Sequence, residues 1–160
     1  MQKANEENQA TMEGNLFEYL DSILHEECFQ KRGKKIWFRK TDSTILICEA
    51  QVSRYSNAFY LNFGIVFPEL VNGNKMPKLS IDNWHVRGRF EEIIKDRKFI
   101  GSFPFEISTK DQVQLKDYLK ENIKSCVVPF LLKYSSVEMV KREIAENVFD
   151  YGRMLTSNQV

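Results

Sequence analysis

Residues 44–67 read TILICEAQVSRYSNAFYLNFGIVF, and this stretch decides the fold. Two runs rich in β-branched and aromatic residues, 44–54 and 58–67, are separated only by Tyr55, Ser56 and Asn57. A connection this short allows neighbouring strands to pair only in the antiparallel direction. The stretch therefore predicts a β-hairpin at the centre of a sheet.

Two more strand-like runs lie outside the hairpin. KKIWFRK (34–40) precedes it across the turn TDS, and WHVRGRF (84–90) follows PELVNGNKMPKLSID, whose Asn-Gly and prolines are typical of a loop. The order predicts a four-stranded antiparallel β-meander. Residues 91–108 stay ambiguous between a helical turn at FEEII and a short edge strand at KFIGSF or FEI, which leaves a fifth strand open.

Helices are expected at both ends of the chain. Apolar residues from Leu16 to Cys28 recur at helical spacing, and the helix is expected to end at Gly33 with Lys31 and Arg32 in its last turn. A second helix begins near Thr109.

Pro129 should end or kink that second helix near residues 125–128, and a capping box from Ser135 to Glu138 starts a last helix. The fold class is therefore α+β, with the meander packed against N- and C-terminal helices. We expect a flexible polar lead-in at 1–14, a single domain at 15–150 and a frayed tail at 151–160.

The composition excludes several classes of protein. The 160 residues carry 23 basic and 22 acidic side chains, so no overall charge attracts nucleic acid or a membrane surface. Three cysteines without a C-x-x-C pair are typical of a reducing cytoplasm and argue against disulfides or zinc. The polar N-terminus does not resemble a signal peptide, and the run CVVPFLL is too short to span a bilayer. We expect a cytoplasmic protein without a metal or cofactor.

Period-two alternation assigns each strand residue to one face of the sheet. The predicted core face collects Ile36, Phe38, Leu46, Cys48, Ala50, Val52, Phe59, Leu61, Phe63, Ile65, Trp84, Val86 and Phe90. The predicted polar face collects Trp37, Arg39, Glu49, Gln51, Ser53, Tyr60, Asn62, His85, Arg87 and Arg89.

The polar face has two interpretations. Antiparallel sheets often leave one face to water, with cross-strand ion pairs that contribute little. A surface that mixes polar and aromatic side chains also suits a ligand groove. The two arginines of WHVRGRF distinguish these interpretations. In the first, Glu49 neutralises Arg87 and Arg89 by ion pairs. In the second, the face that carries the arginines stays open to a ligand.

The leading hypothesis is a non-catalytic binding module that contacts a protein partner or a small anionic ligand. Arg87 and Arg89 would donate charge-assisted hydrogen bonds. The candidate site also includes Gln51, Ser53 and Asn62 for orienting hydrogen bonds and Trp37 or Tyr60 for stacking. The oligomeric state is left open between a monomer and a homodimer.

Two other functions are weighed. A small enzyme acting on an anionic substrate could use Glu49 or His85 as acid or base, although a strand between them would separate them by roughly 9–10 Å. Nucleic acid could bind the basic stretch 31–40, with Trp37 and Phe38 for stacking. The near-neutral chain disfavours nucleic acid, and the chain carries no phosphate loop, dinucleotide fingerprint or H-E-x-x-H motif.

Four stretches in order resemble the domain-of-unknown-function 4304 family of mostly bacterial proteins: CFQKRGKKIWFRK, ICEAQVSRYSNAFYLNFGIVFPEL, WHVRGRF and KENIKSCVVPFLLKYSSVEMV. The resemblance covers roughly residues 16–148 and implies an α+β fold and a cytoplasmic location, without an activity. It directs attention to Gln51, Ser53, Asn62, Arg87 and Arg89. Phe90–Glu91 and KFIGSFPF depart from the family pattern, so a pocket built there would differ.

Overall fold

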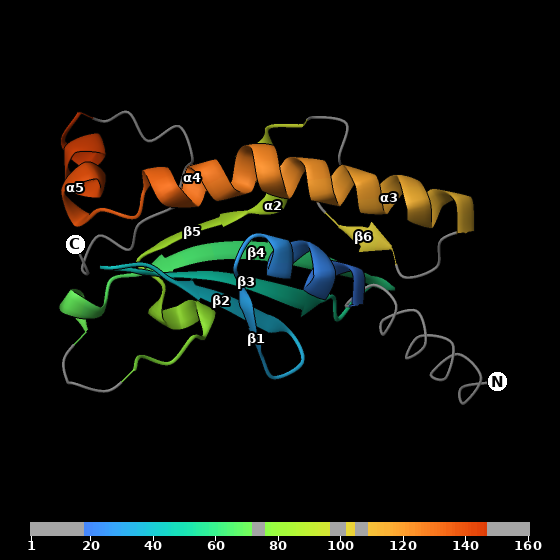
Figure 1. The fold of residues 1–160 in the computed structure, drawn as a ribbon, viewed down its shortest axis with the longest axis horizontal. Helices are drawn as coiled ribbons and strands as arrows, with labels where there is room; N and C mark the ends of the chain where they lie inside the picture. The colour runs from blue at the N-terminus through green and yellow to red at the C-terminus, as the bar shows by residue number, and fades with distance from the viewer. Residues whose placement is uncertain (1–17, 72–75, 97–101, 105–108, 147–160) are drawn as a thin grey trace.

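The hairpin forms the centre of the sheet, as Figure 1 shows for the computed structural model, which describes residues 18–71, 76–96, 102–104 and 109–146. The antiparallel strands follow the order β1-β2-β3-β4-β5, with bounds Gln30–Arg32, Ile36–Lys40, Ile45–Val52, Ala58–Val66 and Val86–Arg89. A short strand β6, Phe103–Pro104, also pairs with β4. The predicted α+β class and antiparallel meander are confirmed; β1 to β5 form the meander, and β6 brings the sheet to six strands.

The region that the sequence left ambiguous contains both alternatives. FEEII forms helix α2, Phe90–Ile94, directly after β5, and Phe103 lies opposite Phe59 in the pairing of β6 with β4. The predicted lead-in at 1–14 and the tail at 151–160 lie outside the described residues.

The first helix ends earlier than predicted. Its described part covers residues 18–26, and Cys28 then adopts the left-handed conformation at φ +65°. The amide of Phe29 donates to the carbonyl of Leu24 and that of Cys28 to His25, the pairing of a Schellman motif. Burial of Phe29 and Leu24 accompanies this end, which periodicity did not reveal. Residues 30–32 therefore form β1, and Gly33, at φ +69°, lies in the β1–β2 turn.

The long C-terminal helix contains a π-helical turn just before Pro129. Helix α3, Thr109–Asn122, continues through a π-helical turn at Ile123–Val127 into α4, Val128–Lys133. Pro129 has no amide hydrogen, and the amide of Val128 bonds the carbonyl of Ile123, five residues back. Helix α5, Val137–Ala145, follows with Ser136 as its cap, one residue later than predicted.

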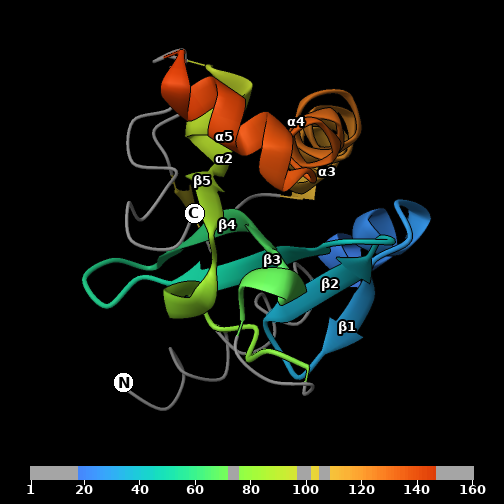
Figure 2. The ribbon, with the colours of Figure 1, turned by 90° about the vertical axis from the view of Figure 1, so that its left-hand side faces the viewer.

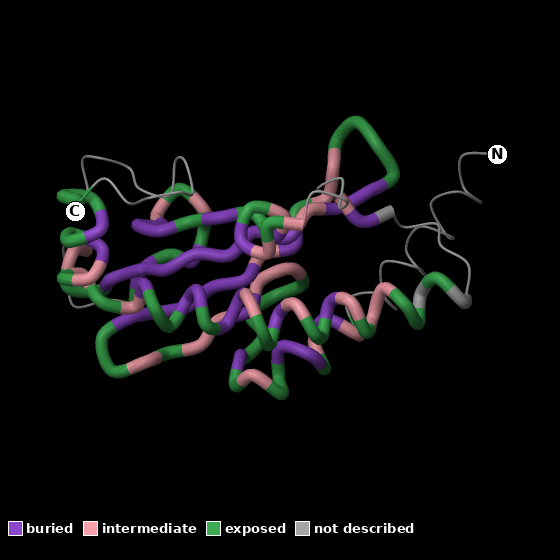
Figure 3. The backbone as a smooth tube through the Cα atoms, turned by 90° about the horizontal axis from the view of Figure 1, so that it is seen from above, coloured by how far each residue is buried: buried purple, intermediate pink, exposed green. Residues whose placement is uncertain are grey.

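The helices cover one face of the sheet. Figures 1 and 2 show α3, α4 and the first helix on this face, with α5 beside them. The main core lies beneath them, and Figure 3 shows the central strands as nearly continuous buried segments. In the described part of the chain, no helix is long and apolar enough to cross a membrane. The main core includes Leu24, Trp37, Cys48, Phe59, Leu61, Phe63, Ile65, Val86, Phe90, Phe103, Leu119, Ile123 and Leu131.

The pairing register corrects the faces assigned to β2. Trp37 lies opposite Cys48 and is fully buried in the main core, not on the polar face. Ile36 and Phe38 lie opposite Glu49 and Ile47 and belong to the other face. Each face of β2 carries a large aromatic residue, Trp37 or Phe38, so alternation alone could not orient it.

Candidate functional site

The second face of the sheet, opposite α3 and α4, is covered at one end (Figure 2), and we call this end the closed half. A smaller apolar cluster lies there, formed by Ile45, Ile47, Val66, Leu79 and Trp84. Figure 2 shows the short 3₁₀ turns η1, Pro68–Leu70, and η2, Ile81–Asn83, on the side of the sheet away from α3 and α4. Leu79 and Trp84, which flank η2, close this half.

Trp84 anchors this closed half. Its indole nitrogen donates to the carbonyl of Leu79 at 3.1 Å, and its ring lies directly over Gly64. A Cβ atom on Gly64 would lie 2.2 Å from the ring, so this strand position requires glycine. The expectation that Trp84 joins the same core as Val86 and Phe90 is wrong: Trp84 follows η2, and the strand alternation begins only at Val86.

The other half of the second face contains a pocket of about 400 Å³. Its floor comes from β3, β4 and β5, and its ends come from η2 and α2. This volume falls within the range of small-molecule sites. The lining residues are Gln51, Asn62, Ile81, Arg87, Gly88, Arg89, Glu91 and Glu92.

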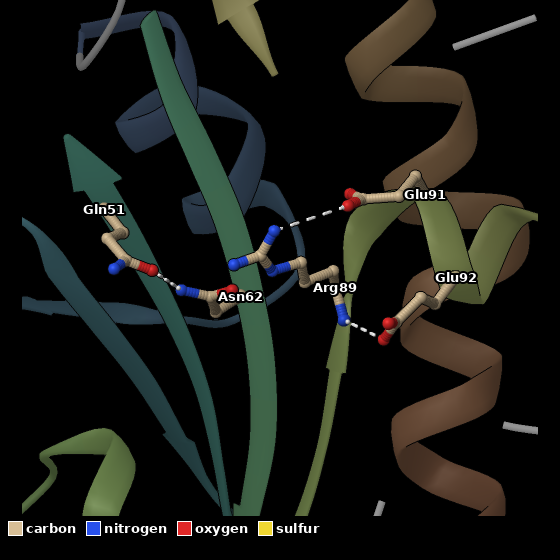
Figure 4. A network of polar contacts seen from close by, with 5 residues as sticks. All are labelled: Gln51, Asn62, Arg89, Glu91 and Glu92. Atoms are coloured by element: carbon tan, nitrogen blue, oxygen red, sulfur yellow. Dashed lines mark hydrogen bonds and ion pairs between the residues drawn. The ribbon is translucent and has the colours of Figure 1, made fainter. Parts of the chain in front are cut away.

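A pair of amides fixes the floor of the pocket. The Asn62 side-chain nitrogen donates to Gln51 Oε1 at 2.9 Å, across the pairing of β3 with β4 (Figure 4). Asn62 is buried, whereas Gln51 is exposed. Because the Gln51 oxygen is directed to Asn62, its NH₂ group is left to donate elsewhere.

Arg89 is held by contacts on both sides. Its guanidinium lies 4.7 Å from the centre of the Tyr60 ring and 4.0 Å from Glu91 Oε1. Its backbone amide donates to Glu92 Oε2 at 2.9 Å, which starts α2 (Figure 4). These contacts place the Arg89 side chain at the pocket without using all of its donors, since guanidinium has five N–H groups.

Arg87 differs from Arg89. It lies opposite Gly64 and is exposed at the pocket. Within the part of the chain that the structure describes, its side chain forms neither a hydrogen bond nor an ion pair. Glu49 pairs with neither arginine among these residues, so the arginine side of the face stays open.

Two carboxyl groups of this region have pKa values above the ordinary value of a glutamate. Burial raises the pKa of Glu91, against a smaller lowering by a backbone hydrogen bond and Arg89. One oxygen of this carboxyl, Oε2, is buried and has no hydrogen-bond partner in the described part of the chain. Burial also raises the pKa of Glu49, against a hydrogen bond with Asn62 that lowers it.

The structure brings together six of the predicted site residues. Gln51, Asn62, Arg87 and Arg89 line the pocket, Tyr60 contacts Arg89, and Glu49 lies opposite Asn62. Their roles in binding stay predictions. Glu91, Glu92 and Ile81 were missed, although the two glutamates that follow WHVRGRF were a visible signal.

Three predicted residues lie elsewhere. Trp37 is buried in the main core. Ser53 Oγ accepts amide hydrogens from Tyr55 and Ser56 and orders the hairpin turn. His85 is buried beside Phe67, whose amide donates to His85 Nδ1 at 3.0 Å, and burial lowers the pKa of His85. The expected position of His85 beside Arg87 is wrong because the strand begins only at Val86.

The basic stretch 31–40 has contacts within the fold. Lys31 lies 3.8 Å from an Asp21 oxygen, and Arg39 donates to the carbonyl of Glu27. Trp37 is fully buried and donates to Asp21 at 2.8 Å, so it offers no face for stacking a base. Among the described residues, no group of His, Cys, Asp and Glu side chains could hold a metal ion.

Comparison with known proteins agrees with the resemblance drawn from the sequence. A family model described as Domain of unknown function (DUF4304) matches residues 20–133. This span holds all strands of the described sheet and all residues that line the pocket. No curated protein and no solved structure matched the chain. Since the matched span covers most of its length, the chain belongs to the DUF4304 family, a domain of unknown function.

Proposed function

We propose that this chain is a non-catalytic binding module of the bacterial cytoplasm, whose pocket holds the anionic group of a small ligand. The observation that carries the proposal is Arg87, an exposed guanidinium at a pocket, without an ion pair among the described residues. Arg89 supplies a second cation, and the Gln51 amide supplies a neutral donor. Guanidinium groups suit carboxylate and phosphate because they donate two parallel hydrogen bonds.

The pocket favours a small ligand over a protein partner. Its volume of about 400 Å³ suits a small molecule, and its ends are closed by η2 and α2. A protein partner that inserts an acidic side chain would contact the same arginines, and substitution of Arg87 would weaken its binding as well.

The test measures anion binding by two-dimensional amide NMR. We expect hexanoate, acetate or inorganic phosphate to shift the amides of Arg87, Gly88 and Arg89 in a saturable way. Arg87→Ala should weaken the binding about tenfold or more, because a hydrogen bond to a charged group contributes about 1.5–3 kcal/mol. Arg54→Ala is the matched control, because Arg54 is exposed at the hairpin turn.

The proposal fails if none of the three anions produces saturable shifts at these amides. It also fails if Arg87→Ala binds them as tightly as the wild type. A large loss of thermal stability in Arg87→Ala would instead indicate a structural role for this side chain, since exposed substitutions usually change stability by less than about 0.5 kcal/mol.

An enzyme that acts on an anionic substrate is the second candidate. The raised pKa of Glu49, caused mainly by burial, favours it, because catalytic acids and bases often have perturbed pKa values. Burial of His85 argues against its part in such a reaction. Nucleic-acid binding through residues 31–40 has less support because Trp37 is buried; it requires affinity that falls steeply with salt.

A further inference from the structure

The charges of the pocket are separated along its length. Arg87 lies opposite Gly64, and the Trp84 ring of the closed half lies over this glycine. Arg89 lies opposite Asn62. The two arginines are therefore roughly 7 Å apart along β5. Glu91 and Glu92 follow in α2, beyond Arg89, and among the described residues both carboxyl groups contact Arg89 and neither contacts Arg87.

The carboxyl end has unused capacity to accept hydrogen bonds. Glu92 is exposed and uses Oε2 for the backbone amide of Arg89, whereas a carboxylate offers about four acceptor positions. Glu91 adds a second carboxyl group, whose Oε1 lies at the distance limit of an ion pair with Arg89, whereas its Oε2 is buried and has no hydrogen-bond partner among the described residues.

A second anionic group is disfavoured at this end. Two carboxyl groups adjoin Arg89, which is the nearest arginine to them, and further negative charge would add repulsion there. A donor group on the ligand would instead find open acceptors.

From this arrangement we infer that the pocket selects a dipolar ligand, whose anionic group meets Arg87 while an ammonium or similar donor meets Glu91 and Glu92. The inference rests on the proposed function and adds the chemical class of the ligand. Amino acids, short peptides and related zwitterions belong to this class, whereas dicarboxylates and polyphosphates do not.

The test uses three probes with the same six-carbon chain: hexanoate, 6-aminohexanoate and adipate. They differ only in the far group, which is methyl, ammonium or carboxylate. We expect 6-aminohexanoate to bind the wild-type chain about tenfold or more tightly than hexanoate, and adipate to bind most weakly. The pairs 4-aminobutyrate with butyrate and 5-aminopentanoate with pentanoate repeat the comparison at shorter lengths.

A double variant and a control variant test whether Glu91 and Glu92 cause the preference for the amino-substituted probe. Glu91→Gln combined with Glu92→Gln should remove the preference for the amino acid and leave hexanoate bound at least as tightly as in the wild type. Glu138→Gln, an exposed glutamate of α5, is the matched control and should keep the preference. Dispersion of the amide spectrum verifies that each variant is folded.

The possible outcomes separate the two proposals. If the anions shift the Arg87 amide but no amino-substituted probe binds more tightly at any length, the dipolar ligand is overturned and the anion site stands. If the preference survives in the double variant, the assignment to Glu91 and Glu92 is overturned. If no probe shifts the Arg87 amide, the anion site and the dipolar ligand both fail.

Discussion

The two halves of the second sheet face lie on the same strands, but one half is covered by other residues and the other half contains a pocket. Toward one end, β3 places Ile45 and Ile47 on this face, and Leu79 and Trp84 close over them. Toward the other end, the same strand places Glu49 and Gln51 on this face, and a pocket remains, which makes this end the open half. Alternation thus determines which residues share a face, but the apolar or polar nature of each residue determines where that face is covered.

The largest effect is expected where the closed half depends on one side chain. Trp84→Ala should lower the free energy of unfolding by about 3–5 kcal/mol, because it removes a fully buried indole and leaves a cavity. Urea unfolding followed by circular dichroism measures this change. A loss below about 1 kcal/mol would mean that the smaller cluster contributes little and that the two halves do not differ as described.

Gly64→Ala tests the same half from the strand side. The added Cβ would collide with the Trp84 ring and approach the carbonyl of Val86, and overpacking of this kind costs about 1–3 kcal/mol. In a Trp84→Ala background the collision with the ring is absent, so the substitution should cost less. Additive effects in the double variant would contradict close packing of these two residues.

The meander was predictable from the sequence because its turns are short and its strands are rich in aromatic and β-branched residues. The antiparallel hairpin between β3 and β4 and the polar cluster of Gln51, Asn62, Arg87 and Arg89 follow from alternation alone.

Three errors have a common physical cause. Trp37, Trp84 and His85 were assigned by alternation, but β2 carries an aromatic residue on each face and β5 begins only at Val86. The long segment between β4 and β5 supplies a second apolar cluster, and a sequence reading that treats it as a solvent loop cannot orient residues beneath it. Tertiary contacts, not local pattern, decided these positions.

The titration of His85 probes the closed half. Burial lowers the pKa of His85 from its ordinary value of 6.5, so the unfolded chain binds a proton there that the folded chain does not. The free energy of unfolding should therefore fall as pH drops below 6.5. His85→Asn, whose side-chain oxygen can accept the Phe67 amide hydrogen, should flatten this slope at a cost of about 1 kcal/mol near neutral pH. His25→Asn, at an exposed position, is the control and should keep the slope; an unchanged slope in His85→Asn contradicts the prediction.

The titration of Glu91 probes the open half and has the opposite sign. Burial raises the pKa of Glu91 above its ordinary value of 4.5, so the folded chain holds a proton at pH values where the unfolded chain has released it. The contribution of Glu91 to the free energy of unfolding should therefore decline as pH rises from 4.5 toward the raised value. Glu91→Gln should remove this contribution, so its stability relative to the wild type should rise over the same pH range, whereas Glu138→Gln, the control, should keep a constant difference from the wild type. A constant difference between Glu91→Gln and the wild type would contradict the prediction.

The smallest effect is expected at Tyr60, whose ring contacts the guanidinium of Arg89 at the pocket. Tyr60→Leu should cost about 0.5–1 kcal/mol, the range of exposed cation–π contacts, whereas Tyr60→Phe retains the ring and should cost less. A double-mutant cycle with Arg89→Ala isolates the coupling between the two side chains, with urea unfolding as the measurement. A coupling near zero would mean that the Tyr60 ring does not hold Arg89, which would leave Glu91 as its partner at the pocket.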